Sequence, residues 1–162
     1  MTNVYSVDEV LAVAEQIERD GQRFYELAAE RCTNLQGKQA LEHLARWEGT
    51  HSPVFSEIRA KLRAANPAAR PYDPDGVAEL YLQAVSEQHV FNASGDPEAL
   101  LAETAGPRQI FELALRFERD SIALFQGLAA VVPEGAEGLA ELIDEEYEHV
   151  AHLQRLLKYG KW

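Results

Sequence analysis

The segment "IERDGQRFYELAA" (residues 17–29) returns as "FERDSIALFQGLAA" (residues 117–130), so that an E-R-D core recurs 100 residues further along the chain. Each copy is followed by an E-x-x-H pattern, within "WEGTHSPVF" (residues 47–55) and within "EEYEHVAHL" (residues 145–153), and these patterns are 98 residues apart. A repeat at nearly constant offset indicates one supersecondary unit that is used twice. The sequence therefore predicts two helical hairpins, each with an acid on its first helix and an acid and a histidine on its second.

Apolar residues recur at spacings of three and four in every long segment, which is the period of an amphipathic helix. Ser6 and Glu9 form a capping box, Asn34 is placed to cap a second helix, and Asp96 with Pro97 begins a short one. Helices are predicted over residues 7–31, about 35–63, 77–90, a short stretch from 97, 107 to the turn "VVPEG", and about 134–158. No segment alternates with period two, so the predicted fold class is all-α.

The order of these helices predicts a ferritin-like four-helix bundle, because two hairpins are joined by one long crossover. Hairpin 1 covers about residues 7–65, an additional helical crossover covers 66–106, and hairpin 2 covers about 107–159. We expect a single domain over residues 1–162, since a chain of this length suits one hydrophobic core.

The acidic charge balance disfavours nucleic acid and anionic membranes as binding partners and favours cations. The chain has 15 basic and 27 acidic side chains and a formal net charge of −12, which repels nucleic acid and anionic membranes and attracts cations. Cys32 is the single cysteine, so neither an internal disulfide nor a thiolate zinc site can form, and a reducing compartment is favoured. No apolar run is long enough for a signal peptide or a membrane span, and we expect a cytoplasmic protein.

Acidic residues interrupt the apolar stripes of the predicted helices at equivalent places. Glu18 follows Ile17 and Glu118 follows Phe117 in the two copies of the repeat. A buried carboxylate without a partner costs several kcal/mol or loses its charge, so an acid in a core stripe needs a partner. A salt bridge to the adjacent arginine is the plain alternative, but residues next to each other in sequence point to different sides of a helix.

The heights of these acids along the bundle can be compared through their distance from each turn. Glu18 and Glu48 are equidistant from Thr33, and Glu118 and Glu146 are equidistant from Val132. At 1.5 Å per residue, each acid lies about 20 Å from its turn. Packing the hairpins together is therefore predicted to place four carboxylates and two imidazoles in one layer. The layer contains Glu18, Glu48, His51, Glu118, Glu146 and His149.

Four carboxylates in a dry core would repel one another, and two divalent cations would cancel their charge. Oxygen and imidazole ligands without thiolate suit iron or manganese better than zinc or calcium. We expect Glu48 and Glu146 to bridge the two metals, with one histidine each as a terminal ligand and the remaining glutamates as outer carboxylates. The E-x-x-H pairs alone are a weak motif in a glutamate-rich chain, and chance pairs in a metal-free domain are the alternative.

The same segments resemble the rubrerythrin-like di-iron proteins of the ferritin-like superfamily, as does "YLQAVSEQHVF" (residues 81–91), and the likeness covers nearly the whole chain. The resemblance implies a non-haem di-iron centre on the six residues above, redox chemistry on O2, H2O2 or Fe(II), and a homodimer. Two features depart from it. One cysteine cannot build a rubredoxin domain, and Gly21 and Ser121 stand where rubrerythrins carry an additional carboxylate. The six-residue set looks more like a bacterioferritin or ferroxidase centre.

Tyr25 is the candidate catalytic residue outside the ligand set. It lies seven residues after Glu18, and in ferritin-like proteins such a tyrosine hydrogen-bonds a ligand or passes an electron. Its repeat mate is Phe125, so packing in the core is the alternative explanation.

Other aromatic and histidine residues receive plainer interpretations. Trp47 and Tyr147 are expected to pack or to lie on the surface, and His152 to lie at the surface or the core edge. An exposed position is favoured for His89, although a place beside a path for iron is the alternative. His43 lies off the apolar stripe and has no predicted role.

The function predicted from these residues is oxidation of Fe(II) by O2 or H2O2, for iron handling or peroxide defence, with two iron ions as cofactor and manganese as the alternative. The electron donor is not specified by the sequence. Oxidation of an organic substrate at the same metals is a second hypothesis, and a metal-free structural or partner-binding domain is a third. The first two hypotheses make the chain a candidate oxidoreductase.

Pro53 follows the first E-x-x-H pair and weakens the helix that carries it. Proline removes the hydrogen bond to the carbonyl of Gly49, so a bend just past His51 is predicted. If the helix ended before His51 instead, as the backbone preference of a residue before proline allows, that ligand assignment would fail.

Overall fold

The computed structural model describes residues 6–65, 75–89, 91 and 95–160, and within these residues the regular elements are all helical. The prediction of an all-α chain is thus confirmed. The elements are α1 (Val7–Arg31), α2 (Leu35–Ala65), α3 (Val77–Gln88), α5 (Pro97–Ala102), α6 (Pro107–Val131), a 3-10 turn η1 (Pro133–Gly135) and α7 (Ala136–Tyr159).

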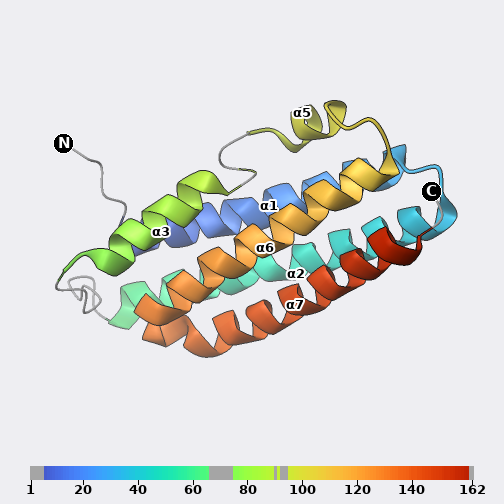
Figure 1. Cartoon of the computed structure of the whole chain (residues 1–162). Coiled ribbons are helices and arrows are strands. Elements are labelled where there is room, and N and C mark those ends of the chain that lie inside the picture. The colour runs from blue at the N-terminus through green and yellow to red at the C-terminus, as the bar shows by residue number, and fades with distance from the viewer. Residues whose placement is uncertain (1–5, 66–74, 90, 92–94, 161–162) are drawn as a thin grey trace.

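The four long helices of the described chain form a bundle of two antiparallel hairpins (Figure 1). Helix α1 packs mainly on α2, and α6 packs mainly on α7; further contacts between α1 and α6 and between α2 and α7 close the bundle. Helices α3 and α5 lie on the outside of the bundle: α3 lies against α1 and α6, and α5 lies against α1. This arrangement directs one stripe of each long helix towards a common interior.

Capping groups fix where the helices begin. The Ser6 backbone N–H donates to Glu9 Oε2 at 2.7 Å, and the Glu9 N–H donates to Ser6 Oγ at 3.3 Å, as the capping box requires. The Asn34 side chain accepts from the N–H of Gly37 at 2.9 Å at the start of α2. The Asp96 side chain accepts from an N–H in the first turn of α5.

Two helix ends differ from the predictions. Helix α3 ends at Gln88, because the backbone at His89 turns to φ −57° and ψ 136° and its ring enters the core. The remaining predicted residue of that helix, Val90, lies outside the described residues. The last helix begins at Ala136 instead of Glu134, since the proline turn η1 precedes it.

Helix α2 continues from Leu35 to Ala65 with Pro53 inside it. The alternative in which the helix ends before His51 is therefore wrong, and Glu48 and His51 lie on one continuous helix. The bend just past His51 stays a prediction. In the described part of the chain, no helix combines the length and the apolar character that a membrane crossing requires.

Candidate metal centre

Six acidic and histidine side chains from the four long helices meet in one layer at the centre of the bundle. Each of them is at most 1% exposed to solvent. The layer consists of Glu18 on α1, Glu48 and His51 on α2, Glu118 on α6, and Glu146 and His149 on α7. The structure thus brings together all six residues that the repeat and the turn distances placed at one height.

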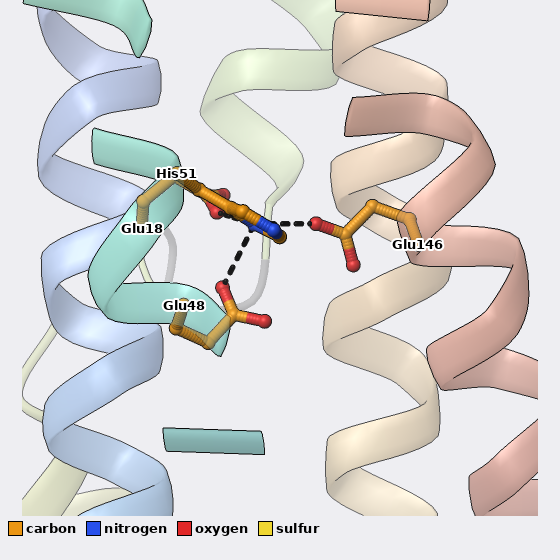
Figure 2. A group of neighbouring side chains, drawn as sticks. All are labelled: Glu18, Glu48, His51 and Glu146. Atoms are coloured by element: carbon orange, nitrogen blue, oxygen red, sulfur yellow. Dashed lines mark hydrogen bonds and ion pairs between the residues drawn. The ribbon is translucent and has the colours of Figure 1, made fainter. Parts of the chain in front are cut away.

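The first group of this layer surrounds the ring of His51 (Figure 2). Ligand atoms of Glu18, Glu48, His51 and Glu146 all lie within 4.8 Å of one another. His51 Nδ1 is 2.9 Å from Glu18 Oε2, 3.0 Å from Glu146 Oε1 and 3.6 Å from Glu48 Oε2. One imidazole nitrogen therefore faces carboxylate oxygens from three helices.

The second group is the counterpart of the first in the repeat. Ligand atoms of Glu48, Glu118, Glu146 and His149 again lie within 4.8 Å of one another. His149 Nδ1 is 2.9 Å from Glu146 Oε2, 3.4 Å from Glu48 Oε1 and 3.6 Å from Glu118 Oε2. Glu48 and Glu146 belong to both groups, and each directs one oxygen to each histidine. These two carboxylates therefore lie between the two histidines and are common to both groups.

Several oxygens of the layer have no hydrogen-bond partner although they are buried. They include Glu18 Oε1, both oxygens of Glu48, Glu118 Oε2 and Glu146 Oε1. Such groups are rare in native proteins and need another source of stabilisation. Among the described residues, no arginine forms an ion pair with Glu18 or Glu118, and Arg19 pairs with Glu15 instead. The donor set and its unsatisfied oxygens fit a pair of divalent cations.

The electrostatics of the layer point the same way. Burial raises the pKa of Glu18 and of Glu118 well above the usual carboxyl range, and the neighbouring carboxylates raise it further. Burial opposes charge on both imidazoles, but the close contacts with the surrounding carboxylates outweigh it and raise the pKa of each ring. Without metal, protons therefore neutralise part of this layer. Cations would displace those protons on binding.

Tyr25 lies next to one side of this centre. The Tyr25 hydroxyl donates a short hydrogen bond to Glu118 Oε1, and the side chain is fully buried. Its repeat mate Phe125 packs on Phe55 with ring centroids 5.1 Å apart. The second group therefore has a phenol next to Glu118, and Tyr25 contacts the cluster in addition to packing in the core.

Two outer partners of the histidines were missed in the sequence. Glu145 Oε2 lies 2.9 Å from His51 Nε2, and the Glu145 side chain is half exposed. The indole of Trp47 stacks on the His149 ring, with centroids 4.7 Å apart and planes at 29°. Glu145 and Trp47 are repeat mates that immediately precede Glu146 and Glu48. The sequence showed that the two residues are equivalent in the repeat. It did not show their contacts, because each one contacts the histidine of the other hairpin.

The positions three residues after Glu18 and Glu118 are Gly21 and Ser121, and neither carries a carboxylate. A Cβ on Gly21 would lie 2.8 Å from Cε1 of Phe117, so the ring leaves no room for a side chain there. Ser121 Oγ lies 3.2 Å from His89 Nε2. The expected exposed position of His89 is wrong, because this residue is fully buried.

The remaining histidines lie outside the two groups. His152 is half buried, in keeping with a position at the core edge. His43 is exposed, and its ring meets the Trp47 ring edge-on with centroids 4.0 Å apart. Tyr147 is 49% exposed and accordingly lies at the surface.

No family model and no curated protein matches the sequence. The fold is similar to a crystal structure from Thermotoga maritima, that of a protein assigned as a ferritin-like diiron-carboxylate protein. The TM-score is 0.69 and the sequence identity 21%, and the match covers 99% of this chain and 100% of the other. At this identity the likeness establishes the fold. The chain is a ferritin-like helical bundle, and its buried cluster is compatible with a two-metal site.

Proposed function

We propose that this protein is a non-haem di-iron oxidoreductase that oxidises Fe(II) with O2 or H2O2. The observation that carries the proposal is the pair of four-residue ligand groups that share Glu48 and Glu146. Two ions held by common carboxylates lie close enough to act on one small oxidant. Iron fits the mixed oxygen and imidazole donors, and manganese is the alternative. A rubrerythrin-like role in peroxide defence belongs to the same proposal and depends on the resemblance of the motifs.

The side chains of the centre have distinct roles in this proposal. Glu48 and Glu146 hold both ions, His51 and His149 each hold one, and the remaining two glutamates complete the outer sides. When bound, the iron pair supplies the electrons that reduce the oxidant. The burial of the layer excludes bulk water, so the carboxylates act on the ions at full strength.

Tyr25 acts on the second ion position through Glu118. Its hydroxyl is placed to hold a proton at Glu118 Oε1, and the phenol is near enough to supply an electron to the ion that Glu118 holds. Burial, followed by the charge of Glu118, raises the pKa of Tyr25 well above its usual range, so the hydroxyl keeps its proton at neutral pH.

The first test is the metal content of the purified protein. We expect about two ions per chain, and we expect Glu146→Ala to lose both because this residue contributes to both groups. Glu141→Ala is the matched control, since Glu141 is an exposed glutamate on the same helix. Metal content that is indifferent to Glu146→Ala would refute the proposal and favour a metal-free structural domain.

The second test separates the redox reactions. The protein is loaded with Fe(II) without oxygen and is then mixed with O2 or with H2O2, while the ferric absorption is recorded. Fast oxidation followed by stored mineral indicates a ferritin, and fast peroxide turnover without storage indicates a peroxidase. A loaded protein that reacts with neither oxidant would contradict the proposed reaction and would favour oxidation of an organic substrate.

A further inference from the structure

A continuous series of ring contacts leads from the ligand cluster to the protein surface. The rings of His51 and His149 are stacked with centroids 5.7 Å apart and planes at 15°. The His149 ring stacks on Trp47 at 4.7 Å, and the Trp47 ring meets His43 at 4.0 Å. Both cluster histidines are buried, Trp47 is half buried and His43 is exposed. The aromatic route therefore connects both ion positions with solvent.

The repeat does not reproduce this route in the other hairpin. Glu145 is the mate of Trp47, and Glu141 is the mate of His43. On that side the outer neighbour of His51 is a carboxylate, which has no aromatic orbitals to continue the series. The two halves share their ligands, but the aromatic extension belongs to hairpin 1.

The outer end of the route opens on a surface depression of about 550 Å³. Polar side chains dominate its lining: Gln36, Gln39, Glu42, His43, Arg46 and His152. Arg46 Nη2 lies 3.2 Å from His43 Nδ1, and the positive charge of Arg155 acts on His152. The charges of Glu42 and Arg46 cancel, so the lining has no net charge in a chain whose net charge is −12. A small anionic molecule is therefore repelled less here than by the acidic chain as a whole, and Arg46 offers it a cationic partner.

We propose that Trp47 is the electron route of the centre, and that a small anionic one-electron reductant docks at the His43 depression to supply it. The inference rests on the proposed function, because it requires iron bound by His149. In each transfer the reductant loses one electron and one ferric ion becomes ferrous. With ascorbate as the reductant, the donor also releases one proton to solvent. Two transfers restore both ions, and the stacked rings provide the electronic contact between donor and ion.

The test measures how fast ascorbate reduces the ferric protein without oxygen. For Trp47→Leu we expect the rate to fall by about tenfold, which corresponds to about 1.4 kcal/mol of activation free energy. Trp47→Phe keeps an aromatic ring and is expected to lie between this variant and the wild type. Tyr147→Leu is the matched control, because Tyr147, like Trp47, is an aromatic residue next to a glutamate of the cluster in sequence, but it lies at the surface. Its rate should equal that of the wild type.

A readout independent of the reaction uses tryptophan fluorescence. The chain has two tryptophans, so Trp162→Phe leaves Trp47 as the single emitter. We expect the emission of this variant to be quenched when Co(II) fills the centre and to change little with Zn(II), which has no redox chemistry. Emission that responds equally weakly to both ions would show that the indole is not coupled to the centre.

The outcomes separate the two proposals. Failure of the wild type to bind metal would refute the proposed function. If wild type and Trp47→Leu both bind two ions and ascorbate reduces both at the same rate, the electron route is refuted and the proposed function is not. The docking part is tested by Arg46→Gln, which should slow ascorbate but not the cationic reductant hexaammineruthenium(II). An equal effect on both reductants would overturn the choice of an anionic donor.

Discussion

His89 makes the stability of this protein sensitive to mild acid, and His89→Gln is expected to remove much of that sensitivity. The His89 ring is fully buried, its Nε2 lies 3.2 Å from Ser121 Oγ, and its Nδ1 accepts from the Phe91 N–H at 3.3 Å. Burial and then the positive charge of Arg116 lower the pKa of His89 to about 3. The folded protein therefore keeps this ring neutral at pH values where an unfolded chain would protonate it.

The sign and the size follow from proton linkage. A free histidine has a pKa of about 6.5, so the unfolded state binds more protons than the folded state between that pH and about pH 3. Stability therefore falls as the pH falls. At pH 5 the contribution is RT ln(1 + 10^1.5), about 2 kcal/mol, and at pH 7 it is about 0.2 kcal/mol. About 2 kcal/mol of the loss due to His89 should therefore develop between pH 7 and pH 5, and the rest develops as the pH falls further towards about 3.

The assay is urea unfolding of the chelator-treated protein at pH 7 and at pH 5. Glutamine keeps an amide that can donate to Ser121, and it does not titrate. All other titrating groups are common to both proteins and cancel in the comparison. The free energy of unfolding of the wild type should drop by about 2 kcal/mol more than that of His89→Gln. His43→Gln, an exposed control, should behave as the wild type does. Equal losses in wild type and His89→Gln would refute a buried neutral ring.

Three further variants test the surroundings of the centre. Gly21→Ala should lower the free energy of unfolding by about 1–2 kcal/mol in urea, because its Cβ would lie 2.8 Å from a Phe117 ring carbon and overpacking exceeds the gain in helix propensity. Glu145→Gln should weaken metal binding by about tenfold in a competition titration, because it removes the anionic partner that orients His51. Tyr25→Phe should lower the free energy of unfolding of the metal-free protein by about 1–3 kcal/mol in the same assay, because the buried Glu118 carboxylate loses the hydrogen bond from the Tyr25 hydroxyl. An unchanged unfolding midpoint would contradict this.

The helical fold and the meeting of the six ligand-type residues could be predicted because both depend on regular spacings. Helical rise is constant, so equal distances from a turn give equal heights, and the repeat carries the same heights into the second hairpin. The residues missed, Glu145 and Trp47, depend on how rings rotate and on contacts between hairpins. His89 depends on where α3 ends. Periodicity contains no information about these features, since they arise only when the helices pack.

The duplication explains why the two groups of the cluster are symmetric, but their outer partners differ, so the two proposed ion positions should be unequal. At the first position, the Glu145 carboxylate lies beside Nε2 of His51. Its negative charge makes Nδ1, the nitrogen that faces the cluster, a stronger metal ligand. At the second position, the Tyr25 hydroxyl draws electron density from Glu118, which weakens that carboxylate as a ligand. Because the four residues of each group are otherwise alike, we expect the position at His51 to bind the first metal ion.

This order of filling can be read from Trp47, because its indole contacts the histidine of the second position. In Trp162→Phe protein, the first equivalent of Co(II) should change the emission little and the second should cause most of the quenching. Glu145→Gln removes the charge that favours the first position, so quenching should then begin with the first equivalent. A quenching curve that is linear over both equivalents in both proteins would show that the outer partners do not distinguish the positions.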